Sequence, residues 1–234
     1  MAEAGSLPVL IRIMNKFILL LSGLSLLACN KPDSPIPSTG HSYYPLEVSS
    51  YNVYKVSGRI KNALQDSLFS YEMLELISKS YTESEQKVYV LEKFMRSSSD
   101  DVWPDTPDTV QSVRLTNNQL IHTNNNKPIA KLAFPPKEGK RWNSNSFNTD
   151  PDVFYTMKNV NREYSINNKT YAPTIVIEQA MDTTNLIKRS KQFEVYANDI
   201  GLVYVYSETI LLDFSSGDTT SADFYTKEYL YSSR

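Results

Sequence analysis

The chain has 234 residues, with 26 acidic and 24 basic side chains, one cysteine and two histidines. Its length fits one domain of ordinary size or two small ones, and a hydrophobic content of 41% is enough for a core. The near-neutral charge balance argues against a nucleic-acid binder, which normally has a clustered basic face. A single cysteine excludes an internal disulfide framework and a thiolate-based zinc site, and two histidines are too few for most histidine-centred metal or catalytic sites.

The most informative segment is residues 14–29, with the sequence MNKFILLLSGLSLLAC. Lys16 supplies a positive charge, and the eleven residues 17–27 that follow are almost wholly apolar. A helix of that length rises only about 16 Å, whereas the hydrocarbon core of a bilayer is about 30 Å thick. A charged region, a short apolar run and a small residue before a cleavage point are typical of a secretory signal peptide.

The cleavage point falls directly before the cysteine. Leu26-Leu27-Ala28-Cys29 resembles the bacterial lipobox, in which the cysteine thiol accepts a diacylglyceryl group and becomes the mature N-terminus. We therefore predict that residues 1–28 are a signal peptide and that Cys29 is the lipid-attachment site. The alternative is a buried free cysteine at the end of a core helix. Because Glu3 and Pro8 are unusual ahead of an export signal, we place the true start at Met14.

A proline-rich tether is expected after the anchor. Residues 30–40, NKPDSPIPSTG, contain three prolines and no apolar periodicity, so we assign residues 29–42 to the lipidated cysteine and a flexible tether. We expect His41, beside the tether, to be solvent-exposed. Two acyl chains anchor a protein stably, which predicts attachment to the outer membrane. Since only Asp33 is an acidic residue close to the cysteine, the periplasmic and cell-surface orientations both stay open.

Residues 43–234 show the period-two alternation of β-strands and are rich in Tyr, Val, Ile and Thr. Asparagine-rich turns are expected at Asn117-Asn118 and at residues 124–126, because Asn tolerates the positive φ of tight hairpins. Residues 63–77 fit either a helix or a strand; we favour a strand over residues 70–77, preceded by a turn at Asp66 and Ser67. The other predicted strands are residues 51–60, 88–95, 110–115, 119–123, 129–134, 154–160, 171–178, 193–197, 202–212 and 222–231.

This pattern predicts one all-β domain built as a single antiparallel meander. A flat open sheet of about ten strands would expose edges that aggregate, so the sheet must curve strongly or close. We expect a barrel or half-barrel, lipocalin-like or similar, whose inner face is either filled or hollow. Gly139 is expected to provide a positive-φ turn, Trp142 to cap the end of the sheet, and Gly201 to mark a bulge or tight turn.

Three phrases of the sequence carry a family resemblance. They are Tyr43-Tyr44-Pro45-Leu46 with the strand that follows it, residues 134–143 (FPPKEGKRWN), and residues 196–204 (YANDIGLVY). Together they resemble, in the same order, small uncharacterised lipoproteins of Bacteroidota that share an aromatic-aromatic-Pro-Leu opening and a Tyr-Ala-x-x-Ile-Gly-Leu-Val phrase. The resemblance implies an all-β, membrane-anchored protein without an assigned activity.

The sequence contains no nucleophile elbow, no His-Glu-x-x-His helix and no phosphate-binding glycine loop. We interpret His122 as a half-exposed strand residue and residues 213–218 as a turn. Four aspartates lie close together in the sequence: Asp100, Asp101, Asp105 and Asp108. They fit either a calcium site in a loop or a solvated loop without a metal, and we favour the solvated loop. We therefore predict no cofactor, no metal and no catalytic residue.

Three functions remain. The first is a non-enzymatic binding module for a lipid, glycan or small apolar ligand, with a hollow inner face lined by Tyr, Phe and Leu. The second is an interaction or assembly subunit of a cell-envelope complex, with a filled interior and an exposed apolar patch. The third, an enzyme, would need two carboxylates with perturbed pKa values in one cleft. We favour the first; the ligand-binding residues are unknown at this stage.

The anchor can be tested directly. Replacing Cys29→Ser removes the thiol that accepts the lipid, so the variant should leave the membrane fraction and appear in the soluble fraction. Fractionation and immunoblotting measure this. A variant that stays membrane-bound contradicts the lipobox assignment.

Overall fold

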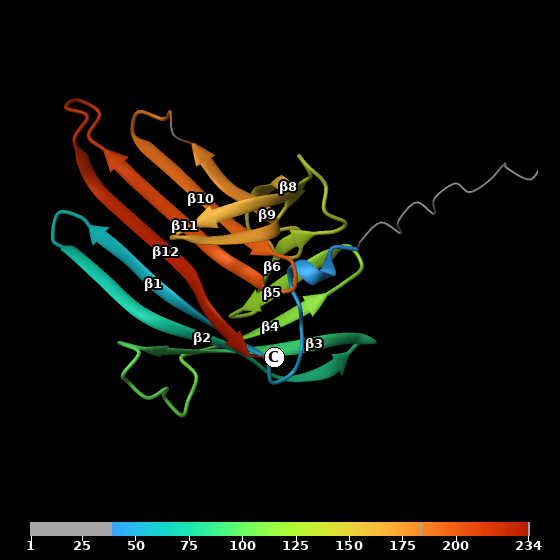
Figure 1. The fold of residues 1–234 in the computed structure, drawn as a ribbon. Helices are drawn as coiled ribbons and strands as arrows, with labels where there is room; N and C mark the ends of the chain where they lie inside the picture. The colour runs from blue at the N-terminus through green and yellow to red at the C-terminus, as the bar shows by residue number, and fades with distance from the viewer. Residues whose placement is uncertain (1–38, 183, 234) are drawn as a thin grey trace, which may run out of the picture. The chain divides into compact units, whose positions relative to one another are not determined.

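A computed structural model describes residues 39–182 and 184–233 (Figure 1). The predicted signal peptide, Cys29 and the tether up to residue 38 lie outside these residues. Within the described ranges, no helix is long and apolar enough to span a membrane. Within the predicted tether, residues 39–42 contact the domain: His41 packs edge-on against Phe134, and the Ser42 hydroxyl donates to Asn198 Oδ1 over 2.5 Å.

The described chain forms one short 3-10 helix, η2 (His41–Tyr43), and strands that all belong to one sheet. The strands are β1 (Tyr51–Lys61), β2 (Asp66–Glu83), β3 (Gln86–Arg96), β4 (Thr109–Leu115), β5 (Gln119–Asn124), β6 (Lys127–Ala133), β7 (Arg141–Asn143), β8 (Phe154–Ile166), β9 (Lys169–Asp182), β10 (Lys188–Ala197), β11 (Gly201–Leu212) and β12 (Thr219–Ser233).

The all-β, antiparallel prediction is confirmed, and the topology explains how the sheet curls. The order is β6-β5-β4-β3-β2-β1-β12-β11-β10-β9-β8-β7, so the first strand pairs with the last and joins two six-stranded meanders. The sheet therefore ends at β6 and β7, which follow each other in the chain. Bulges, such as those at Val53/Tyr54 in β1 and Val195/Tyr196 in β10, help to bend the strands.

The two sheet ends meet at a seam that nearly closes the barrel. The Ala130 amide on β6 donates to the Ser144 carbonyl, just after β7, over 2.9 Å. Trp142 Nε1 donates to the Ala130 carbonyl over 2.9 Å, and Asn148 Nδ2 donates to the Pro128 carbonyl over 2.7 Å. Trp142 thus caps the end of the sheet, as its position predicted. These bonds satisfy backbone groups that an open edge would leave exposed.

The ambiguous segment before residue 78 is a strand, as favoured, but the expected turn at Asp66 and Ser67 is wrong. Both residues already pair with β1, and the turn covers residues 62–65, closed by the Asn62 amide donating to the Gln65 carbonyl over 2.7 Å. Asp66 forms a two-pronged pair with Arg59 across the hairpin, at 2.6 and 2.7 Å. A side chain that pairs across strands was thus mistaken for one that ends them.

The other turns follow their chemistry. Asn125 and Asn126 have φ of 48° and 60° in the β5–β6 hairpin, and Gly139 and Gly201 have φ of 73° and 94°. The hairpin at Asn117-Asn118 also forms, with the Thr116 amide donating to the Gln119 carbonyl over 2.9 Å. Every strand predicted from alternation coincides with an observed strand. The three-residue β7 was missed because it is too short to show a period.

Part of the barrel interior is filled by an apolar core. Its buried members come from η2, from strands on both sides of the seam and from the loop after β6. They include Tyr43, Leu120, Trp142, Met157 and Ile175. This core fixes the point where the chain enters the domain, and it leaves the rest of the inner face for other side chains.

A second cluster lies where the β8–β9 hairpin crosses over β10 and β11 to reach β12 (Figure 1). Tyr164 packs against Tyr204, and Asn167 and Lys169 at the hairpin tip bond to Glu228 and to the Tyr229 carbonyl over 2.6 and 3.1 Å. The sequence prediction ended both strands of this hairpin early, because polar residues at 161–163 interrupt the alternation.

The seam gives a stability prediction. Trp142→Phe removes the Nε1 donor, leaves the Ala130 carbonyl without that bond and creates a small void, so it should lower the free energy of unfolding by about 2 kcal/mol. Trp103→Phe is the matched control: it keeps an aromatic face for Arg96 in an exposed loop and should change stability by less than about 0.5 kcal/mol. Urea denaturation measures both. Equal effects contradict the role assigned to the seam.

Candidate functional site

A cavity of about 360 Å³ opens in the inner face of the curled sheet, beside the apolar core. Its walls are unusual for a protein interior because charged side chains and tyrosines dominate them. The lining side chains come from nine strands and the loop before β1: Tyr44, Glu75, Lys93, Gln111, His122, Asn124, Lys127, Ile129, Lys131, Tyr155, Glu194, Tyr196, Leu202, Val205, Tyr225 and Lys227.

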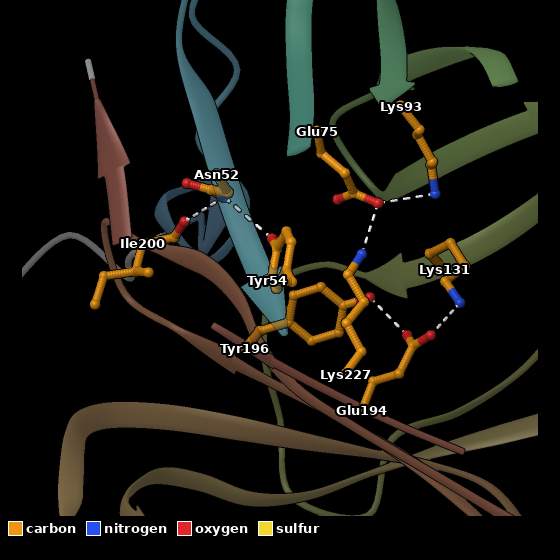
Figure 2. Close-up of polar contacts among 9 residues, drawn as sticks. All are labelled: Asn52, Tyr54, Glu75, Lys93, Lys131, Glu194, Tyr196, Ile200 and Lys227. Carbon is orange, nitrogen blue, oxygen red and sulfur yellow. Dashed lines mark hydrogen bonds and ion pairs between the residues drawn. The ribbon is translucent and has the colours of Figure 1, made fainter. Parts of the chain in front are cut away.

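The first charged group is centred on Glu75 of β2 (Figure 2). Its Oε1 accepts from Lys227 Nζ of β12 at 2.6 Å and from Lys93 Nζ of β3 at 2.8 Å. Lys227 also lies over the Tyr54 ring, with Nζ 3.9 Å from the ring centroid. Glu75 and Lys227 are buried, whereas a fifth of the Lys93 side chain is exposed. One carboxylate therefore serves two cations.

The second charged group is centred on Glu194 of β10 (Figure 2). Its Oε1 pairs with Lys131 Nζ of β6, and its Oε2 accepts from the Tyr196 hydroxyl at 2.6 Å. Strands β6 and β10 are not neighbours in the sheet, so this pair spans the barrel interior. The side chain of Lys131 is 21% exposed and lines the cavity.

Burial and charge act against each other on these groups. Burial alone would raise the pKa of Glu75, but the charges of Lys227 and Lys93 outweigh it and hold that pKa well below its usual range. The pKa of Glu194 is likewise lowered, because Lys131 overcomes the effect of burial. For Lys227, burial prevails over the attraction of Glu75 and lowers the pKa to about 8. Both carboxylates are thus ionised at neutral pH.

His122 of β5 lies in the wall of the same cavity and is half-exposed overall, as predicted, but one of its ring nitrogens is enclosed. Its Nε2 atom is inaccessible to solvent and has no hydrogen-bond partner among the described residues. The Tyr44 ring packs edge-on against the imidazole, with centroids 5.2 Å apart. Burial, together with the charges of Lys131 and Lys93, lowers the pKa of His122 to about 3. The imidazole is therefore neutral, and its free nitrogen lies within the charged interior.

The remaining candidate residues lie away from this cavity. His41 is half-buried against Phe134, so its predicted exposure is wrong. The four aspartates at positions 100–108 stay in an exposed loop, where Asp101 accepts from Ser98 and Asp108 from the Met95 amide. Residues 213–218 form a turn closed by Asp213, as expected. Cys29 lies outside the described residues. In the described part of the chain, no three His, Cys, Asp or Glu side chains could together hold a metal ion.

The predicted apolar lining of Tyr, Phe and Leu is correct only for the tyrosines and Leu202. The charged residues were missed although the sequence carried a signal. Glu75 stands between Leu74 and Leu76, and Glu194 stands between Phe193 and Val195, so each is a charge with apolar neighbours on both sides in the sequence. A charge at an inward-facing position of such a strand must be paired inside the fold, because an isolated buried charge is costly.

Comparisons with known proteins add one structural likeness. No protein-family model matches the sequence, and no curated protein matches it. Among solved structures, a protein of Bacteroides fragilis described as a candidate exported protein with a YmcC-like fold is 9% identical. The alignment covers 81% of this chain and 98% of that chain, with a TM-score of 0.41.

The buried imidazole makes stability depend on pH. His122 in the unfolded chain binds a proton near pH 6.5, whereas the folded protein binds it only near pH 3. The unfolded state thus holds more protons between these values, so acidification should destabilise the fold, by up to about 1.4 kcal/mol per pH unit. His122→Gln should show a flatter dependence between pH 6.5 and 5 in urea denaturation. His41→Gln is the control, and equal slopes in wild type and His122→Gln contradict the burial of a neutral imidazole.

Proposed function

We propose that this protein is a non-enzymatic, membrane-anchored binding protein whose curled sheet holds a polar ligand, with a glycan as the ligand class. The observation that carries the proposal is the cavity lined by tyrosines and ion pairs. Among the three ligand classes that the sequence left open, this lining fits a glycan better than a lipid or an apolar molecule. An apolar ligand would cover charged groups without hydrogen-bonding to them, which costs free energy.

The lining has the donors and acceptors that a sugar needs. Tyr155 and Tyr225 offer ring faces and hydroxyl groups, and Gln111 and Asn124 offer amides that both donate and accept. Polar groups on a sugar ring can therefore replace the water that the charged walls would otherwise bind. The binding groups are also held in place, because the ion pairs join strands on different sides of the barrel.

The predicted anchor supplies the setting. With Cys29 acylated, the domain would stand on the outer membrane, facing either the periplasm or the cell surface, where envelope glycans are present. Binding without chemistry is proposed because the charged groups of the cavity are engaged with one another: both carboxylates are paired with lysines and kept ionised.

A second candidate, an assembly subunit of a cell-envelope complex, is favoured by a different observation. Large apolar side chains are exposed at or near the tips of three hairpins, β1–β2, β9–β10 and β11–β12, whose strands lie next to one another in the sheet. These side chains are Leu64, Leu68, Leu186, Ile187 and Phe214. Figure 1 shows the β1–β2 and β11–β12 tips at the same end of the sheet. Serine substitutions at these tips leave the cavity unchanged. They should therefore abolish binding to an envelope partner without affecting the binding of a ligand in the cavity.

The glycan proposal predicts that cavity tyrosines matter and surface tyrosines do not. Tyr155→Leu should weaken the binding of a glycan identified on an array by about tenfold or more, because a stacked aromatic contact and its hydroxyl are worth about 1–2 kcal/mol. Tyr81→Leu, on an exposed part of β2, is the matched control and should bind as wild type does. Isothermal titration calorimetry measures both. The proposal is contradicted if no glycan on the array binds, or if the two variants bind with equal affinity.

A further inference from the structure

We propose that the cavity selects an anionic ligand and holds its negative group between Lys93, Lys131 and His122. This inference rests on the proposed function and narrows it from polar ligands to acidic ones. It follows from three features of the described residues: an unbalanced charge, unused hydrogen-bond donors and a buried nitrogen without a partner.

The charge of the lining does not cancel. Four lysines and two glutamates line the cavity, which leaves two positive charges. One belongs to Lys127, which pairs with Asp150 outside the lining. The other arises at Glu75, whose single carboxylate is shared by two lysines. One positive charge therefore remains inside the barrel, and an anion would neutralise it at a place where water screens charge poorly.

Lys93 is the part of that group which faces the open space. Lys227 is buried, and its ammonium is enclosed by Glu75 and the Tyr54 ring. Lys93 approaches Glu75 from β3 (Figure 2). A fifth of its side chain is exposed. An ammonium group has three donors. Among the described residues, Lys93 makes its ion pair with Glu75 and Lys131 makes its ion pair with Glu194, so each keeps donors for a ligand.

His122 supplies the third group. It lines the same cavity as Lys93 and Lys131, and the charges of these two lysines disfavour its protonation. The unpartnered Nε2 can donate to an anion when it carries the proton. The charged and titratable groups around the imidazole come from several elements: Tyr44 before β1, Glu75 on β2, Lys93 on β3, Lys131 on β6 and Glu194 on β10.

An anion between these groups changes the balance at the imidazole. It would offset the two ammonium charges that now disfavour protonation of His122. The pKa of His122 should therefore rise when the ligand binds, and binding should take up protons as the pH falls toward that pKa. A neutral ligand of the same size would not have this effect. The response of His122 thus distinguishes an acidic ligand from any ligand that merely fills the cavity.

The test uses the full chain in detergent micelles and two sugars that differ in one group. Methyl glucuronoside carries a carboxylate where methyl glucoside carries a hydroxymethyl group, and inorganic phosphate is the third probe. The protein has only two histidines, so its imidazole NMR signals are few, and His41 is an internal control. We expect the glucuronoside to bind about tenfold more tightly than the glucoside, to raise the pKa of His122 and to leave the His41 signals unchanged.

The outcomes separate the inference from the proposed function. Equal affinities for the two sugars overturn the anion preference and leave glycan binding standing. If phosphate binds and neither sugar does, the anion site is supported and a glycan is contradicted as the ligand class. No binding of any probe at concentrations of tens of millimolar overturns both.

Lys93 provides the variant that tests the site itself. Lys93→Met leaves Glu75 paired with Lys227 alone, so the interior keeps a balanced ion pair and the fold should persist. The tenfold preference for the glucuronoside should then disappear, and Lys93→Arg should restore most of it. Lys55→Met, on an exposed position of β1, is the control and should keep the preference. A Lys93→Met protein that retains the full preference overturns the proposed site.

Discussion

The arrangement of the barrel interior depends on the ion pairs that the Glu75 carboxylate forms with Lys93 and Lys227. These ion pairs link β2, β3 and β12, close to the place where β1 and β12 join the two six-stranded meanders. An ion pair inside a protein is costly to desolvate and is a weak source of stability. Here the ion pairs fix the positions of side chains rather than adding much stability. They hold charged side chains away from an apolar core and keep a hollow beside that core.

The seam and the charged interior depend on each other. Bonds from Ala130 and Trp142 bring the sheet ends together, and the pair of Lys131 with Glu194 crosses the space that this closure encloses. An open sheet would leave Lys131 and Glu194 on separate, solvated strands. Closure of the sheet therefore brings charged side chains from distant strands together in one cavity.

The fold was largely predictable from the sequence, since alternation and turn residues are local signals. Strand β2 was recognised despite its helical stripe, whereas its turn was misplaced because Asp66 pairs across the hairpin. The site could not be predicted in the same way. Which charges meet depends on closure between β6 and β7, and the ion pair of Lys131 and Glu194 joins residues 63 positions apart. The glutamates flanked by apolar residues were the signal available, and they indicate members of the site without showing which lysines pair with them.

The most direct test of this account is native mass spectrometry of the protein extracted from its own membrane in mild detergent. If the charged hollow binds an acidic ligand, the wild-type protein should carry an additional small mass that is lost on denaturation and is identified as an anion. The Lys93→Met protein should carry much less of it. An additional mass that is neutral, or that wild type and Lys93→Met carry equally, would contradict the account.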